Sequence, residues 1–293
     1  MGENRYCSGV RNMDINKVWK VELDLLEKFK TICKKNGLSY CASSGTLLGA
    51  VRHKGFIPWD DDIDLFLPWK DYKKLLEIAP SECQYPYCFQ SFLTEKDGEA
   101  SASRLRRSDT TGFTKWENDN VTNPDYDKGI FIDIFPLFNV PDTEDDKAKQ
   151  KEQIMYYWKC IRGHDAFNQM AQGKEPNPDY VKYIHFYEQI KDEMTIEEIK
   201  WAYLNACDNK EERTKEVGAT SSRVHLPSLM WDSELYDSFI ELPFEDTTIT
   251  CPKKYEKVLE KQYGDWRTPV ENGARHEMVI IDPDTPWKDR ILG

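Results

Sequence analysis

The sequence predicts an α+β protein: a mixed β-sheet flanked by helices forms the first half, and a mainly helical part follows. Two patterns support this fold class. Up to about residue 141, short apolar runs that end at Gly or Pro alternate with stretches in which apolar residues recur every three or four positions. Beyond that point, helical patterns rich in Lys, Glu and Tyr dominate. The 293 residues allow one large domain or two modest ones.

The first half is expected to alternate helices with strands. An amphipathic helix is predicted over 14–36, where Asp14 can cap the start and Asn36-Gly37 supplies the stop. A strand over 38–42, a short helix over 46–52, a strand over 63–67 and a helix over 69–79 follow. Further strands are predicted over 87–93, 102–107 and 129–135, the last one ended by Pro136.

Helices are expected in the second half over 142–161, 178–192, 195–208 and 252–263. We therefore divide the chain into a core domain, residues 1–141, and a helical region, residues 142–293. The helical region is expected to pack on the core and to complete its substrate site.

Charge and composition exclude several classes of protein. The formal net charge of −12 disfavours nucleic acid as a partner and gives no general attraction to anionic lipid. No apolar run approaches the ~18 residues of a membrane span, and the first twenty residues show no signal-peptide pattern. We expect a cytoplasmic chain without a transmembrane segment, for which peripheral membrane contact stays open.

The eight cysteines follow no regular framework, which indicates free thiols in a reducing compartment. A zinc site built from Cys83, Cys88, Cys160 and His164 is the alternative, although the sequence holds no CxxC pair.

The segment Ile57 to Leu67 carries the densest chemical signal. Strand alternation would place Asp62 and Asp64 on one face, about 6.5–7 Å apart, and the apolar residues on the other. Two such carboxylates repel each other unless a cation lies between them, and Mg²⁺ or Mn²⁺ accepts oxygen ligands of this kind. The segment therefore predicts a catalytic metal site.

Two other interpretations of these aspartates are open. Asp60, Asp62 and Asp64 fit the first half of a calcium loop, but its sixth position is Leu65 where the loop requires glycine. The segment also fits a solvated acidic turn.

Two further features extend the predicted metal site. Asp133 lies in an otherwise apolar strand, where backbone donors or one arginine usually satisfy a lone aspartate. Beside Asp62 and Asp64, we expect it to be a third ligand of a two-metal centre. Gly45 and Thr46 lie where a strand enters a helix, so backbone N–H groups there can receive a phosphate.

Basic and aromatic residues supply the remaining candidates. Arg52, Arg104 and Arg106 are predicted to bind phosphate oxygens, with Arg104 and Arg106 on one strand face. A cationic head group would lie over aromatic rings, for which the candidates are Trp59, Trp116, Tyr126, Trp231 and Trp266. His276 is a weaker candidate.

Two segments resemble signatures of the LicD family, whose relatives include the fukutins. The first runs from Gly45 to Arg52 and on to Ile57–Leu65, and the second is Phe131–Leu137. A weaker likeness spans Tyr255 to Pro269 and contains Tyr263-Gly264-Asp265-Trp266. The strong resemblance covers about residues 40–68 and 100–140.

The resemblance implies a nucleotidyltransferase fold for the core. It also implies metal-dependent transfer of a substituted phosphate, most often phosphocholine, from a CDP-activated donor to a sugar hydroxyl of a cell-surface glycan precursor, with release of CMP. Two Mg²⁺ or Mn²⁺ ions are implied. Asp62 and Asp64 match the metal-binding pair, Asp133 the third acidic position, and Gly45 and Thr46 the phosphate-holding turn.

CDP-ribitol and CDP-glycerol are the family's alternative donors, and the acceptor is a glycan or glycolipid. Two other enzyme classes fit the same residues. One is a nucleotidyltransferase that moves a nucleotide from an NTP to a small acceptor and releases pyrophosphate. The other is a manganese-dependent glycosyltransferase of the DxD type, which leaves Asp133 and the Gly-Thr turn unexplained.

Overall fold

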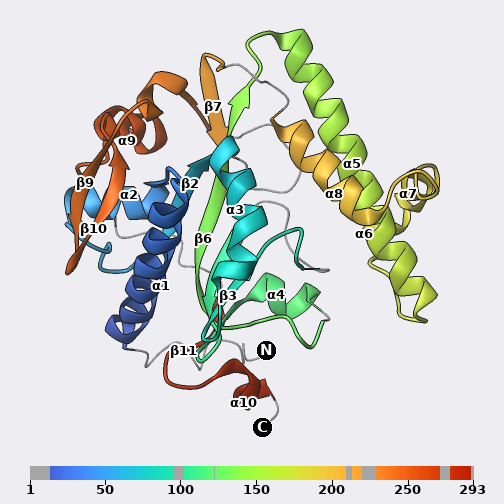
Figure 1. The fold of residues 1–293 in the computed structure, drawn as a ribbon, viewed down its shortest axis with the longest axis horizontal. Helices are drawn as coiled ribbons and strands as arrows, with labels where there is room; N and C mark the ends of the chain where they lie inside the picture. The colour runs from blue at the N-terminus through green and yellow to red at the C-terminus, as the bar shows by residue number, and fades with distance from the viewer. Residues whose placement is uncertain are drawn as a thin grey trace, which may run out of the picture. The chain divides into compact units, whose positions relative to one another are not determined.

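A computed structural model describes residues 14–95, 102–121, 123–208, 213–219, 229–270 and 278–291 (Figure 1). The chain divides into two compact units. Unit 1 consists of Met1–Leu137 and Glu234–Gly293, and unit 2 consists of Phe138–Ser233. The last sixty residues thus belong with the first unit, whereas the sequence analysis assigned them to a C-terminal region beginning at 142.

Unit 1 is built on a mixed sheet with strand order β1-β2-β6-β4-β3. Strands β2 and β6 are parallel, and the other neighbouring pairs are antiparallel. These elements and those around them are α1 (Ile15–Asn36), β1 (Cys41–Ala42), α2 (Ser44–Arg52), β2 (Asp64–Pro68), α3 (Trp69–Glu82), β3 (Tyr87–Gln90), β4 (Ser103–Arg107), β5 (Thr111–Thr114), α4 (Lys115–Asn120) and β6 (Ile130–Val140). The predicted α+β class with a mixed sheet flanked by helices is confirmed.

The two faces of this sheet differ in character. Leu65, Leu105 and Ile134 lie on one face, which α1 and α3 cover in Figure 1. On this face Tyr72 of α3 hydrogen-bonds Ser103, and Arg107 pairs with Asp24 of α1. The opposite face carries charged side chains of β2, β4 and β6.

Helix α1 forms as predicted. The Asp14 side chain accepts the Asn16 N–H, and Gly37 ends the helix with φ of 63°, a left-handed conformation that favours glycine. Its apolar side buries Val18, Leu25 and Phe29.

Strand β6 does not end at Pro136, as the sequence predicted, but continues to Val140. The Asp133 N–H donates to the carbonyl oxygen of Ile63, the residue just before β2, so alternation turns the Pro136 nitrogen toward the β4 side. Strand β4 begins opposite Ile134, and the missing N–H of Pro136 therefore removes no hydrogen bond to β4.

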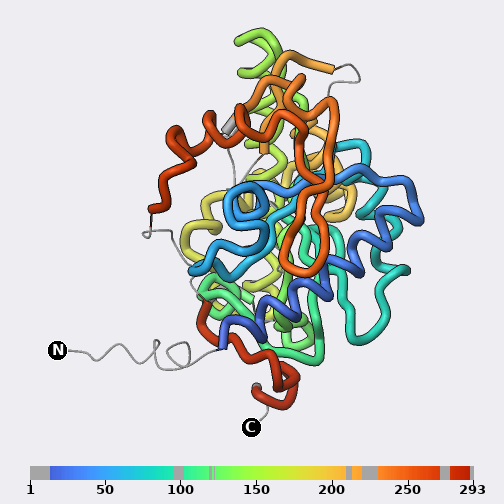
Figure 2. The backbone as a smooth tube through the Cα atoms, turned by 90° about the vertical axis from the view of Figure 1, so that its left-hand side faces the viewer, coloured from blue at the N-terminus to red at the C-terminus, as the bar shows by residue number. Residues whose placement is uncertain are grey.

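The C-terminal part of unit 1 contains more strand than the sequence predicted. It holds β9 (Phe239–Phe244), β10 (Thr247–Pro252), α9 (Tyr255–Tyr263), β11 (Met278–Asp282) and α10 (Trp287–Ile291), after a short 3-10 turn over Ser233–Tyr236 that starts at the unit boundary. Strands β9 and β10 form a hairpin, and β11 pairs with β5. Figure 2 follows this segment in orange and red.

Unit 2 contains the long helix α5 (Glu144–Ala171), α6 (Pro178–Val181), α7 (Ile184–Glu188), α8 (Ile196–Cys207), β7 (Glu216–Ala219) and β8 (Leu229–Asp232). The helix predicted over 178–192 is thus two short helices. Thr195 and Glu198 form a capping box at the start of α8. Among the residues that the structure describes, no helix combines the length and the apolar character that crossing a membrane requires.

Candidate active site

A pocket of about 450 Å³ opens in unit 1 between α2, the loop before β2, and the segment that begins with α9. Its volume lies in the range of small-molecule sites. Of the described residues that line it, Asp60, Asp62, Asp64 and Asp265 are acidic and Arg52 alone is basic. The apolar part of the wall includes Trp59 and Trp266. A strongly acidic pocket of this kind favours a cation.

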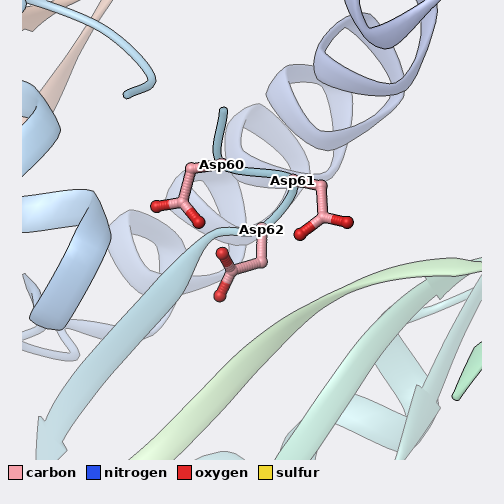
Figure 3. Close-up of side chains that lie close together, drawn as sticks. All are labelled: Asp60, Asp61 and Asp62. Atoms are coloured by element: carbon pink, nitrogen blue, oxygen red, sulfur yellow. The ribbon is translucent and has the colours of Figure 1, made fainter. Parts of the chain in front are cut away.

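Asp60, Asp61 and Asp62 lie on the loop that leads into β2 (Figure 3). Each offers a carboxylate oxygen, and these oxygens all lie within 4.8 Å of one another. Such a set fits a hard divalent cation, which prefers oxygen ligands. Among the described residues, the group with this metal-binding geometry contains no cysteine or histidine, so it gives the zinc alternative no support.

The aspartate loop is held by residues far away in the sequence. The Trp19 indole N–H of α1 donates to Asp60 O at 3.0 Å. The Trp19 ring also stacks on Phe56, with centroids 4.9 Å apart. The Phe56 N–H donates to the Glu245 carboxylate at the tip of the β9–β10 hairpin, at 2.9 Å. These contacts fix the loop backbone and so the positions of its carboxylates.

Asp64 and Asp133 are register partners on the parallel strands β2 and β6. Side chains of residues directly opposite each other lie on the same face of a sheet, so the two carboxylates share the charged face. Strand β2 begins at Asp64, and Asp62 precedes it; their common position in the pocket results from the loop, not from strand alternation. Asp133 is buried and does not line the pocket.

Arg104 holds the Asp133 side chain. Its Nε donates to Asp133 Oδ1 at 2.8 Å, and its Nη1 donates to Glu117 Oε1 at 2.6 Å. The single arginine that usually satisfies a buried aspartate is therefore present. Burial by itself would raise the pKa of Glu117, but the charges of Arg106 and Arg104 outweigh it and lower that pKa to about 2.

Arg106 does not reach the pocket, contrary to the predicted phosphate contact. Its side chain is 0% exposed, and it donates to Gln90, to Glu117 and to the carbonyl oxygens of Gly112 and Gly129. Arg104 and Arg106 do share one face, as predicted, because both contact Glu117. All three nitrogens of this guanidinium donate hydrogen bonds inside the protein, so Arg106 has a structural role: it links β4 to α4 through Glu117.

Gly45 and Thr46 lie at the start of α2, next to two of the aspartates that line the pocket. A Cβ on residue 45 would lie 2.4 Å from Asp60 Oδ2, so the Asp60 carboxylate requires glycine there. The Thr46 hydroxyl is buried and accepts the Asp64 N–H at 2.8 Å. Thr46 therefore fixes Asp64 through its side chain. Arg52, at the other end of α2, lines the pocket and donates to Trp266 O at 2.9 Å.

The structure adds residues that the sequence analysis missed. Tyr263, Asp265 and Val270 line the pocket from the C-terminal segment, which a helix prediction alone could not place there. Burial, followed by the charges of Asp64, Asp60 and Asp62, raises the pKa of Tyr263 above its ordinary value.

Glu22 of α1 was also missed, and here a signal was available. It interrupts the apolar stripe of Val18, Leu25 and Phe29, where a carboxyl has no ordinary place.

The aromatic candidates separate clearly. Trp59 and Trp266 line the pocket. Tyr126 is buried and donates to Glu117, and Trp231 belongs to unit 2. Trp116 lies in α4, and His276 lies outside the described residues.

Comparison with known proteins agrees with this geometry. Residues 37–163 match the family model of the LicD/FKTN/FKRP nucleotidyltransferase domain. The lipopolysaccharide cholinephosphotransferase LicD of Haemophilus influenzae is 38% identical over 78 residues, which is 27% of this chain and 29% of that protein. The ribitol 5-phosphate transferase FKRP of Homo sapiens is 32% identical over 74 residues, which is 25% of this chain and 15% of that protein.

The matched part of this chain thus spans less than a third of the length of these curated relatives. The family-model match at residues 37–163 includes Gly45, Asp62 and Asp133. The resemblance found in the two sequence signatures is confirmed: residues 37–163 match the nucleotidyltransferase domain of the LicD family.

Proposed function

We propose that this protein is a metal-dependent phosphotransferase. It moves a substituted phosphate, phosphocholine in the first instance, from a CDP-activated donor to a sugar hydroxyl of a glycan or glycolipid precursor and releases CMP. The observation that carries the proposal is the acidic pocket, in which Asp62 and Asp64 lie together and Asp64 is in register with Asp133.

Asp62, Asp64 and Asp133 would hold the divalent ions, Mg²⁺ or Mn²⁺. When bound, such ions neutralise charge on the diphosphate and lower the pKa of the attacking hydroxyl. The protein positions the carboxylates for that task through Thr46, which fixes Asp64, and through Arg104, which fixes Asp133. Preorganised groups of this kind avoid reorganisation during the reaction.

Arg52 supplies the positive charge for the donor. It is the basic group among the described residues that line the pocket, and its guanidinium is suited to phosphate oxygens. The hydrogen bond to Trp266 O holds the side chain at the pocket wall. We assign it to the diphosphate of the donor.

Trp59 and Tyr263 support a choline head group. Both line the same pocket as the aspartates, and an aromatic face attracts a quaternary ammonium. The Haemophilus relative is named for cholinephosphate transfer and the human relative for ribitol 5-phosphate transfer. The aromatic wall favours choline because ribitol and glycerol carry no cationic head group.

The test is to incubate the full chain and Mg²⁺ with CDP-choline, CDP-ribitol, CDP-glycerol and NTPs. Thermal protection and the released product are then recorded, with an added sugar acceptor. We expect CMP release that EDTA abolishes. Pyrophosphate release from an NTP would instead identify a nucleotidyltransferase, and cleavage of a sugar nucleotide a glycosyltransferase.

Asp64→Asn should reduce CMP release at least about 10³-fold while the far-UV spectrum stays unchanged, since it removes a charge aimed at the transition state. Asp246→Asn changes an exposed aspartate of the β9–β10 turn that does not line the pocket; it is the matched control and should retain turnover. Wild-type rates in Asp64→Asn would refute the metal-dependent mechanism.

A further inference from the structure

A second, much smaller cavity lies beside the acidic pocket. Its volume is about 10 Å³, which is room for roughly one water-sized sphere. Glu22, Asp61 and Asp62 line it, and the rest of the wall is apolar: Ile130, Phe131, Met278 and Ile281. None of the described residues that line it carries a positive charge.

Glu22 is the unusual member of this cavity. It projects from α1, in the middle of a buried apolar stripe, and is 1% exposed. Its Oε2 atom is buried and makes no hydrogen bond. A buried carboxylate oxygen without a donor is unfavourable unless a cation or a proton compensates its charge.

The surroundings of Glu22 strengthen this point. Its acidic neighbours in the cavity are Asp61 and Asp62, and none of the other described lining residues offers it a hydrogen-bond donor side chain. The apolar wall also keeps water away from the Glu22 carboxyl group. Oxygen ligands, an apolar surround and a volume for one small ion are together the features of a site for a hard divalent cation.

We propose that Glu22, Asp61 and Asp62 form an additional divalent-cation site, in which Glu22 is a ligand contributed by α1. Helix α1 precedes residues 37–163, so this ligand lies outside the matched family domain. The inference rests on the proposed function only in that Asp62 would be shared with the reaction centre. A cation here would link the aspartate loop to Glu22 of α1 and set the position of the Asp62 carboxylate.

The test is a Mn²⁺ titration of the metal-free full chain without donor or acceptor, with free Mn²⁺ followed by electron paramagnetic resonance. We expect Glu22→Gln and Asp61→Asn each to lose the same class of bound Mn²⁺, or to weaken it about tenfold or more. The matched control is Glu27→Gln, the same change on an exposed part of α1 where Glu27 pairs with Lys30, and it should bind as wild type.

Glutamine keeps the shape of a protonated glutamate, so Glu22→Gln should fold. Its melting temperature in EDTA checks this, and Asp61→Asn provides the test if it does not. Unchanged Mn²⁺ stoichiometry and affinity in a folded Glu22→Gln would overturn the site and leave Glu22 as a neutral buried acid. Because no substrate is present, this result is independent of whether the wild type cleaves a CDP-linked donor.

Discussion

Replacing Glu117 by glutamine should destabilise unit 1, because Glu117 is the carboxylate that lies between two buried arginines. Its side chain is 0% exposed and pairs with Arg104 and with Arg106, whose own side chains are 13% and 0% exposed. Glutamine preserves the shape but removes the charge. Arg104 would keep its pair with Asp133, whereas Arg106 would lose its ion pair with Glu117.

Two arguments give the size of the effect. Glu117 has its pKa lowered from an ordinary 4.5 to about 2, which corresponds to about 3 kcal/mol of stabilisation of the charged form. Removal of one partner from a buried ion pair typically costs about 3–5 kcal/mol. At roughly 2–4 °C per kcal/mol, a loss of about 3–5 kcal/mol should lower the melting temperature by about 6–20 °C at pH 7.

The sign of the pH dependence gives a sharper check. A carboxyl with a depressed pKa stabilises the fold above its unfolded pKa, and this stabilisation is lost as the pH falls through the folded pKa. The difference between wild type and Glu117→Gln should therefore be full above pH 5 and shrink between about pH 4.5 and 2.

Thermal and urea unfolding followed by circular dichroism measure both effects. The control is Glu256→Gln: Glu256 pairs with Arg267 at 3.0 Å, but the two side chains are 60% and 54% exposed. An exposed pair of this kind contributes about 0–1 kcal/mol. The reasoning is refuted if Glu117→Gln lowers the melting temperature no more than Glu256→Gln does.

Three further substitutions probe the site. Gly45→Ala places a Cβ 2.4 Å from Asp60 Oδ2, so Mn²⁺ affinity measured by calorimetry should fall about tenfold; an unchanged affinity would contradict this role. Thr46→Val removes the acceptor of the Asp64 N–H and should lower the free energy of unfolding in urea by about 1–3 kcal/mol, whereas Thr46→Ser should retain it. Tyr263→Leu removes an aromatic lining residue, so steady-state assays should show KM for CDP-choline raised about 2- to 30-fold. An equal rise for CDP-glycerol would exclude recognition of the ammonium group.

The local elements were predictable because local interactions specify them. Helix α1 has its apolar period, its Asp14 cap and its Gly37 stop within one continuous segment. Strand β6 is an apolar run with one out-of-place carboxylate, and this contrast indicated Asp133. Asp64 was indicated by its spacing of two residues from Asp62. Pro136 misled the prediction because its effect on a strand depends on which neighbour its nitrogen faces.

The sequence predicted Asp62 and Asp64, which line the pocket, but it missed Glu22 and Asp265 and did not distinguish the roles of the arginines. Arg104 and Arg106 have the same residue type on the same strand face, yet one holds Asp133 and the other is saturated in the core. That difference arises from Glu117 and from backbone carbonyl groups in other segments. A sequence pattern indicates which face of the sheet a side chain lies on, but not which groups from other segments contact it on that face.

By itself, the sequence determined the acidic chemistry, the mixed α+β elements and the family signatures, since each depends on residues close together in the chain. The tertiary structure alone brought Tyr263 and Asp265 to the pocket and Glu22 next to the aspartate loop. These residues lie far from Asp62 in sequence, and their proximity to it results from packing of α1 and the C-terminal segment around the aspartate loop. Such contacts depend on the fold of unit 1 as a whole, because a short segment does not specify which other elements will pack against it.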